Sequence, residues 1–234
     1  MHTLPWIWSP AYELDIGVHV YPTGKYRRIR DRLVAEGTLR EADFHPPEPV
    51  SPSELTVVHD AAWIDRVFGA GLTSEQERLL ELPFSPDLRD AFVLCCCGTL
   101  EAGRLALEHG ISIHLGGGFH HAFRGHGEGF CLLNDVAVAS GALRAEGAAS
   151  RVAVVDLDVH HGNGTAAIFQ SVPEVFTFSM HQQWNYPAVK PAGDLDIPLP
   201  DGTTDAAYLE LLETHLPTVV AHDHELIIYL AGVD

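Results

Sequence analysis

The stretch Asp156-Leu-Asp158-Val-His160-His161-Gly162-Asn163 gathers two carboxylates and two imidazoles directly after an apolar run, Val152–Val155. In extended chain, residues two apart point to the same side, so Asp156, Asp158 and His160 share a face. Carboxylate oxygen and imidazole nitrogen together suit a hard or borderline divalent metal ion. Taken alone, the same residues also fit a strand that ends in a polar turn.

Two further runs favour the metal interpretation. Ile111–Leu115 leads into Gly116, Gly117 and Gly118 and then into the adjacent histidines His120 and His121, and a second apolar run, Leu226–Leu230, leads to Asp234. Ligands and catalytic groups gather at the carboxyl edge of open parallel sheets. Three apolar strands that each deliver His or Asp at this edge predict a metal site there.

Four segments of the chain resemble the zinc-dependent histone deacetylase family. They are Gly116–Ala122, Gly129–Asp135, Asp156–Gly162 and Ala231–Asp234, and they occur in the family's order and spacing. Asn163, with Phe178–His181 and Asn185–Pro187, is most similar to the class IV branch and its bacterial relatives. The resemblance covers nearly the whole chain from about Tyr12, and it implies hydrolysis of N-acyl-lysine amides by an arginase/deacetylase-like fold.

The resemblance implies a role for each matching residue. Asp158, His160 and Asp234 would hold Zn²⁺, and the same oxygen-rich set could also hold Fe²⁺ or Co²⁺. Three protein ligands leave positions open for water and substrate, as in a catalytic site. The general base would be His121, with His120 in support, and the partners that orient these two imidazoles would be Asn163 and Asp156 respectively.

The substrate and a second ion are implied in the same way. Phe130 and Tyr186 would form the walls of a tunnel for the acyl-lysine stem, and the Gly129 carbonyl would accept a hydrogen bond from the substrate amide. A structural K⁺ ion would sit behind the catalytic metal, and its implied ligands are Asp156, Asp158, His160, Ser179 and the Met180 carbonyl.

The elements that must position these residues follow from the apolar spacing. Helices are predicted over Pro86–His109, from Asn134-Asp135 to Leu143, and from Thr204-Asp205 to His215, where Pro217 would end the helix. Strands are predicted at Leu55–Val58, Ile111–Leu115, Val152–Val155 and Leu226–Leu230. Their alternation predicts a single-domain, three-layer α/β fold, in which helices cover both faces of a mostly parallel sheet.

Composition limits the class of protein. The chain has 234 residues, 46% of them hydrophobic, and a net charge of −18, which excludes the basic surface of a nucleic-acid-binding protein. An acidic surface favours cationic partners, here an acyl-lysine protein or a small acylamine. The three consecutive cysteines Cys95–Cys97, and Cys131, are expected to pack in the core. Without a signal peptide or a membrane span, a cytoplasmic protein is expected; the oligomeric state is left open.

One departure from the family keeps other interpretations open. The chain stops at Asp234, before the tyrosine that would stabilise the oxyanion, so residues 1–234 are expected to be a catalytic domain that is incomplete at its C-terminus. Alternatives are an acylpolyamine or small-amide hydrolase, and a non-catalytic metal-binding or interaction module. A ureohydrolase is disfavoured because it needs further Asp ligands for a second metal, which this sequence does not offer. A nucleotide-phosphate loop is disfavoured because the motif G-x-G-x-x-G is absent.

Overall fold

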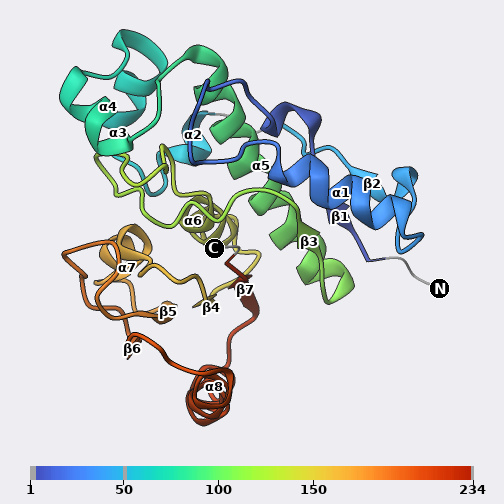
Figure 1. The fold of residues 1–234 in the computed structure, drawn as a ribbon, viewed down its shortest axis with the longest axis vertical. Helices are drawn as coiled ribbons and strands as arrows, with labels where there is room; N and C mark the ends of the chain where they lie inside the picture. Colours follow the sequence, from blue (N-terminus) through green and yellow to red (C-terminus); the bar gives the residue numbers. More distant parts are fainter. Residues whose placement is uncertain (1–3, 50–51, 233–234) are drawn as a thin grey trace. The chain divides into compact units, whose positions relative to one another are not determined.

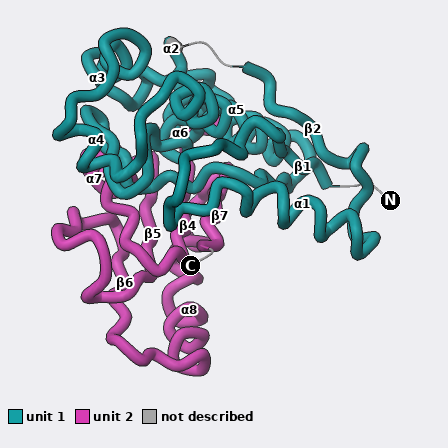
Figure 2. The backbone as a smooth tube through the Cα atoms, turned by 45° about the horizontal axis from the view of Figure 1, so that its top comes forward, with its two compact units in different colours: residues 1–148 teal, residues 149–234 magenta. Residues whose placement is uncertain are grey.

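The computed structural model describes residues 4–49 and 52–232, in which helices alternate with short parallel strands (Figure 1). The chain divides into two compact units, residues 1–148 and residues 149–234 (Figure 2). Among the described residues, none of the helices has both the length and the apolar character that crossing a bilayer requires.

Unit 1 is mainly helical and contains a small parallel sheet in the order β2-β1-β3. These strands are β1 (Trp6–Ile7), β2 (Phe44–His45) and β3 (Ile113–His114). The α-helices of the unit are α1 (Lys25–Ala35), α2 (Pro52–Leu55), α3 (Ala61–Asp65), α4 (Ser74–Leu80), α5 (Pro86–His109) and α6 (Asp135–Ala145). Three short helical turns complete it: the 3-10 helices η1 (Pro10–Tyr12) and η2 (Glu41–Asp43) and the π-helix η3 (Arg66–Ala70).

Helix α5 has the predicted bounds because both of its ends carry strong signals. The Ser85 hydroxyl accepts a hydrogen bond from the Leu88 N–H at 3.1 Å, and Pro86 begins the helix. At the other end Gly110 takes the left-handed conformation, with φ of +89°, which suits a residue without Cβ. The side chains of Cys95, Cys96 and Cys97 are buried free thiols, as predicted for core packing.

Helix α6 is the most completely buried helix of unit 1 and packs along α5. Every residue from Asp135 to Leu143 is buried, and Asn134 caps the first turn by accepting a hydrogen bond from the Ala137 N–H at 2.9 Å. The predicted start of this helix is confirmed. A buried N-terminus that contains a carboxylate requires polar partners, which are described below.

The predicted strand at Leu55–Val58 is wrong. Leu55 is the last residue of α2, and the chain turns after it, with the His59 N–H donating to the Leu55 carbonyl at 3.0 Å. The β-branched side chains of this segment serve tertiary packing instead of a sheet. Val57 and Val58 occupy the space that a Cβ on Gly141 of α6 would need, so tertiary packing overrides the local β-propensity.

Unit 2 is a four-stranded parallel sheet in the order β6-β5-β4-β7, with a helix on each face. The strands are β4 (Val152–Asp156), β5 (Val175–Gln182), β6 (Leu195–Leu199) and β7 (Leu226–Leu230), and the helices are α7 (Asn163–Phe169) and α8 (Asp205–Val220). Asp156 at the end of β4 is level with Ser179 on one neighbouring strand and with Leu230 on the other. The carboxyl ends of these strands therefore meet at one edge.

Helix α8 runs through Pro217, so the prediction that this proline ends the helix is wrong. Proline disrupts a helix interior because it has no N–H to donate and because its ring crowds the preceding turn. Beyond it, Val219 is fully buried in a core cluster with Ala153, Val155 and Phe178 of the sheet. The burial of this last turn offsets the unfavourable proline.

The α/β class with parallel strands and covering helices is confirmed. The described strands fall into two sheets: β3, which leads to the histidine pair, lies in the small sheet of unit 1, whereas β4 and β7 lie in unit 2. Strand β3 is also shorter than the predicted run Ile111–Leu115.

Candidate metal and histidine site

Asp158 and His160 meet directly after β4. The Asp158 Oδ1 atom lies 3.0 Å from His160 Nδ1, and it also accepts the His160 backbone N–H at 2.8 Å. Two ligands of a tetrahedral Zn²⁺ with bonds of roughly 2.0–2.1 Å are about 3.3 Å apart. The donor pair therefore fits a divalent cation. Both side chains keep some exposure, 16% and 27%, so an ion and a substrate have access.

The third predicted ligand, Asp234, lies outside the described residues. The chain just before it passes close to the other two ligands: the Leu157 N–H donates to the Leu230 carbonyl at 3.0 Å. A Cβ placed on Gly232 would lie 2.9 Å from the Asp158 Cα atom, so only glycine permits this close approach. The approach of β7 to Asp158 supports the prediction for Asp234.

The predicted K⁺ ligands Asp156 and Ser179 lie on neighbouring strands in register. Both side chains are buried, and the Asp156 Oδ1 atom accepts the Asp158 N–H at 3.1 Å. Both also line a small cavity of about 10 Å³, which is the space that one water or one ion fills. Met180, the next residue of β5, is buried, and its carbonyl remains a predicted ligand.

Tyr186, a predicted tunnel wall, lies beside the metal ligands. Its ring is 6.2 Å from the His160 ring between centroids, in an edge-on arrangement. The Tyr186 N–H donates to the Asn185 Oδ1 atom at 2.7 Å, which holds the loop that follows β5. The structure therefore brings Tyr186 and His160 together within unit 2, as an aromatic wall beside a metal requires.

The two adjacent histidines, His120 and His121, belong to unit 1. Both are buried, with their ring centroids 4.1 Å apart, and the His120 N–H donates to the Gly118 carbonyl at 3.0 Å in a tight turn. The pair follows β3 through the three glycines, as the sequence predicts. Two buried imidazoles in contact are suited to holding and moving a proton.

Gly129 and Phe130 form a tight turn with unusual backbone geometry. Their φ angles are +53° and +65°, and the Glu128 and Cys131 backbones bond to each other on either side of the turn. A bulky residue at positive φ is strained and marks a constrained position. The Phe130 ring lies against the rings of His19 and Tyr21, with centroids 5.2 and 5.9 Å away. The strained turn presents an aromatic side chain, which supports the predicted wall.

The Gly129 carbonyl, predicted to bind the substrate amide, accepts a hydrogen bond from the Cys131 thiol at 3.3 Å. A carbonyl oxygen has a second lone pair, so this contact leaves the predicted role possible. The thiol of Cys131 is buried and serves packing and this local bond, as the sequence predicts.

Asn163, the predicted partner of the general base, is buried at the first position of α7. Its backbone N–H donates to the His161 carbonyl at 2.8 Å, which places it in the turn that follows the metal ligands. The predicted pairs, Asp156 with His120 and Asn163 with His121, each join a residue of unit 2 to one of unit 1. They stay predictions.

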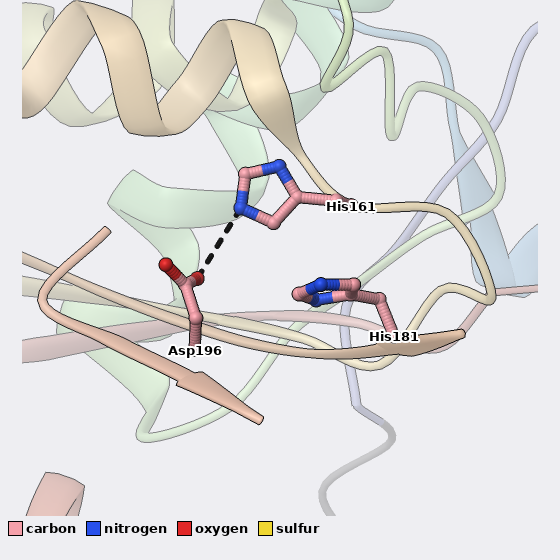
Figure 3. A group of neighbouring side chains, drawn as sticks. All are labelled: His161, His181 and Asp196. Atoms are coloured by element: carbon pink, nitrogen blue, oxygen red, sulfur yellow. Dashed lines mark hydrogen bonds and ion pairs between the residues drawn. The ribbon is translucent and has the colours of Figure 1, made fainter. Parts of the chain in front are cut away.

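A second group of metal-type side chains, which the sequence did not predict, lies beside this site in unit 2: His161, His181 and Asp196 (Figure 3). His161 Nε2 lies 3.2 Å from Asp196 Oδ1, and His181 Nδ1 lies 3.0 Å from the Ser179 hydroxyl. Although burial opposes ionisation, hydrogen bonds from His161 and from the Gly193 N–H lower the pKa of Asp196. The remaining nitrogen of His161, Nδ1, is buried and has no hydrogen-bond partner among the described residues.

The ligand atoms of the three side chains lie within 4.8 Å of one another, so the group has the donor set and spacing of a metal site. A histidine that binds a metal through one nitrogen donates the other N–H to an acceptor in nearly every known site. Asp196 is such an acceptor for His161 Nε2, and this hydrogen bond ties the loop after β4 to β6. The motif Asp194-Leu-Asp196 repeats the D-x-D spacing, and it is the sequence signal that could have pointed to this group.

Comparison with known proteins gives consistent results. A sequence profile described as the histone deacetylase domain matches residues 19–234. The chain is 38% identical over 232 residues to an uncharacterized protein of Picosynechococcus, which covers 98% of this chain and 77% of that protein. It is 32% identical over 254 residues to the acetoin utilization protein AcuC of Bacillus subtilis, over 97% of this chain and 65% of AcuC.

A more distant relative and a solved structure extend this picture. The histone deacetylase-like amidohydrolase of Pseudomonas aeruginosa is 27% identical over 253 residues, which are 99% of this chain and 65% of that protein. The crystal structure of the HDA15 HD domain matches with a TM-score of 0.75 over 97% of this chain and 73% of that one. At 23% identity this match is a likeness of fold.

Proposed function

The chain belongs to the histone deacetylase family, and from that premise we propose that it carries the catalytic machinery of a metal-dependent hydrolase of N-acyl-lysine amides. The observation that carries the proposal is the pair of Asp158 Oδ1 and His160 Nδ1, 3.0 Å apart after β4. Asp234 would complete the ligand set. Zn²⁺ is the proposed ion, and the same donors accept Fe²⁺ or Co²⁺.

Each group of the chain then has a chemical task. The chemistry that a divalent ion supplies at Asp158 and His160 is polarisation of the amide carbonyl and a lower pKa for the attacking water. His121 takes the proton from that water and later gives it to the leaving amine, and His120 shares the charge. Asp156 orients His120, and Asn163 orients His121, through the second ring nitrogen. A K⁺ ion held by Asp156, Asp158, His160, Ser179 and the Met180 carbonyl would offset the carboxylate charge.

The substrate side of the proposal rests on two aromatic residues. Phe130 is held at positive φ with its ring against His19 and Tyr21, and Tyr186 lies beside His160. The stem of an acylated lysine is a narrow aliphatic chain that fits between such rings, while the Gly129 carbonyl accepts its N–H. The net charge of −18 favours encounter with lysine-rich proteins or small cationic acylamines.

The test is hydrolysis of an acetyl-lysine peptide and of a long-chain acyl-lysine peptide by the purified 234-residue chain. Zinc-loaded and chelator-treated samples are compared, with His121→Ala as the catalytic variant and Asp87→Asn, an exposed carboxylate in the first turn of α5, as the control. Turnover that needs zinc and is lost only in His121→Ala supports the proposal. Stoichiometric zinc without turnover favours a metal-binding module, and turnover of acylpolyamines alone favours the small-amide hydrolase.

A further inference from the structure

The N-terminus of α6 holds the backbone on both sides of the adjacent histidines His120 and His121. Asn134 and Asp135 follow the strained turn of Phe130 in sequence, and both are completely buried. Their side chains reach back to residues 118–122, the segment that contains the two histidines. Residues that only cap a helix need neither complete burial nor contacts to distant parts of the chain, so Asn134 and Asp135 have a further structural role.

Asp135 holds the entrance of this segment through backbone donors. Its Oδ1 atom accepts the Phe119 N–H at 2.7 Å, and its Oδ2 atom accepts the Gly118 N–H at 3.1 Å and the Thr99 hydroxyl. A carboxylate offers two acceptor oxygens, so it accepts from all three donors, whereas an amide would replace one of these acceptors by a donor. Burial raises the pKa of Asp135, while the hydrogen bonds from Thr99, Phe119 and Gly118 act in the opposite direction and favour its ionised form.

Asn134 binds the C-terminal part of the same segment, and here the side chain is the hydrogen-bond donor. Its Nδ2 atom donates to the Ala122 carbonyl at 3.1 Å and to the His120 carbonyl at 3.4 Å. Its Oδ1 atom meanwhile caps α6 by accepting the Ala137 N–H. The side-chain amide is the group that can do both, because it carries donors and an acceptor. The acid therefore meets backbone donors, and the amide meets backbone acceptors.

A buried relay fixes the position of Asp135 from the other side. Because Asp135 only accepts, Thr99 donates to it, and the Thr99 oxygen then accepts from His114 Nδ1 at 3.0 Å. His114 Nε2 is left as an acceptor for the Tyr12 hydroxyl at 2.8 Å. Burial lowers the pKa of His114 to about 3, so the ring stays neutral and the direction of the relay is fixed.

Gly117 and Gly118 of the loop and Gly98 of α5 make room for this arrangement. A Cβ on Gly117 would lie 2.1 Å from Asp135 Oδ2, and one on Gly98 would lie 2.3 Å from His114 Nε2. Gly118 has φ of +82° with open space around it, so its requirement is conformational. The glycine run therefore leaves room for the Asp135 carboxylate and permits the backbone turn that this carboxylate stabilises.

We propose that Asn134 and Asp135 are positioning residues, a backbone clamp that sets the rings of His120 and His121 for proton transfer; the inference rests on the proposed function for the role of those rings. A misplacement of a reacting group by about 1 Å can cost on the order of 100-fold in rate, so two pairs of backbone hydrogen bonds are sufficient to matter.

The decisive variant is Asn134→Ser. Serine remains a good helix cap and can accept the Ala137 N–H, but it has no amide to donate to the His120 and Ala122 carbonyls. We expect kcat to fall about 10- to 100-fold with unchanged KM and unchanged zinc affinity, because the predicted ligands Asp158, His160 and Asp234 lie in residues 149–234. Asp135→Asn should lower kcat similarly, whereas the matched control Asp87→Asn, another first-turn carboxylate, should not.

A readout independent of turnover keeps the clamp separate from the proposed function. The ring titrations of His120 and His121, followed by NMR of ring-labelled histidine in the zinc-loaded chain, should shift their midpoints in Asn134→Ser and not in Asp87→Asn. If Asn134→Ser keeps the wild-type kcat and the titration midpoints do not move, the clamp is overturned. The clamp is also overturned if kcat falls only in proportion to a loss of folded protein or of bound zinc. An inactive wild type overturns the proposed function alone, and the ring titrations then decide the clamp.

Discussion

At the scale of single residues, the proposed chemistry depends on what stands beside each imidazole. A carboxylate at position 163 would make a partnered imidazole more basic than the neutral amide of Asn163 does. In this chain Asn163 is buried at the start of α7. If Asn163 partners His121 as proposed, the identity of this one buried residue sets the pH range in which the general base works.

Substitution of Asn163 by Asp tests this idea. If Asn163 partners His121, the acidic limb of the pH dependence of kcat/KM should move upward by about one pH unit or more, because an adjacent negative charge stabilises imidazolium. The measurement is kcat/KM from pH 5 to 9 for both proteins at equal zinc content. An unchanged profile would show that Asn163 is only a turn residue.

Phe130 gives a second prediction at this scale. At φ of +65°, a residue with a Cβ is strained by about 1–2 kcal/mol relative to glycine. Phe130→Gly should therefore be more stable than Phe130→Ala by roughly that amount, although glycine is ordinarily the less stable of the two. Urea denaturation of the two variants measures the difference, and both should lose activity on the long-chain acyl peptide. Equal stability would contradict the strain.

At the scale of elements, capping residues and burial together determine where each helix begins and ends. α5 begins and ends where its cap residues predict, with Ser85 and Gly110 at its boundaries. α8 instead continues through Pro217 because Val219 is buried against the sheet. The predicted strand at Leu55–Val58 became a turn because its valines pack on Gly141 of α6.

Pro217 can be tested by removing it. The side chain is exposed, so Pro217→Ala loses little packing while it restores an N–H donor for the carbonyl of Glu213. We expect the free energy of unfolding to rise by about 2 kcal/mol, the helix gain less the extra freedom of the unfolded chain. Thermal denaturation monitored by circular dichroism measures it. Loss of stability in Pro217→Ala would mean that the proline geometry itself is required.

At the scale of the whole molecule, buried neutral histidines make stability depend on pH. Burial lowers the pKa of His59 to about 4 and that of His114 to about 3, compared with an ordinary value of about 6.5. Between about pH 6.5 and pH 4, the unfolded chain binds protons at these positions and the folded chain does not. The free energy of unfolding therefore decreases as the pH falls, by about 1.4 kcal/mol per pH unit for each group.

His59 permits a direct check of this dependence. His59 Nδ1 lies 3.0 Å from the Phe123 carbonyl, and Nε2 accepts the Asn134 N–H at 3.0 Å, a pairing that a glutamine amide can partly reproduce without titrating. Urea denaturation at pH 7, 6 and 5 should show a smaller slope for His59→Gln than for the natural chain. Identical slopes would contradict a neutral buried His59.

The sequence by itself determined which residues are proposed for the site, because residue type and spacing are written in the chain. The i, i+2 spacing of Asp158 and His160, the glycines before His120 and His121, and the caps of α5 are local features. Local features also predicted the α/β class, because the apolar periodicities of α5, β4 and β7 are written in the sequence and persist in the fold.

Only the tertiary structure decided which polar groups meet across long sequence distances. The pairing of Asp196 with His161, the relay from Tyr12 to Asp135, and the contact of Gly232 with Asp158 join residues 35, 123 and 74 positions apart. Buried polar groups must find partners wherever the packed chain places them, and no local pattern encodes that choice. Asn134 and Asp135 illustrate this point: the local sequence predicts only that they begin a helix, whereas the tertiary structure makes them hydrogen-bond partners of the segment that contains His120 and His121.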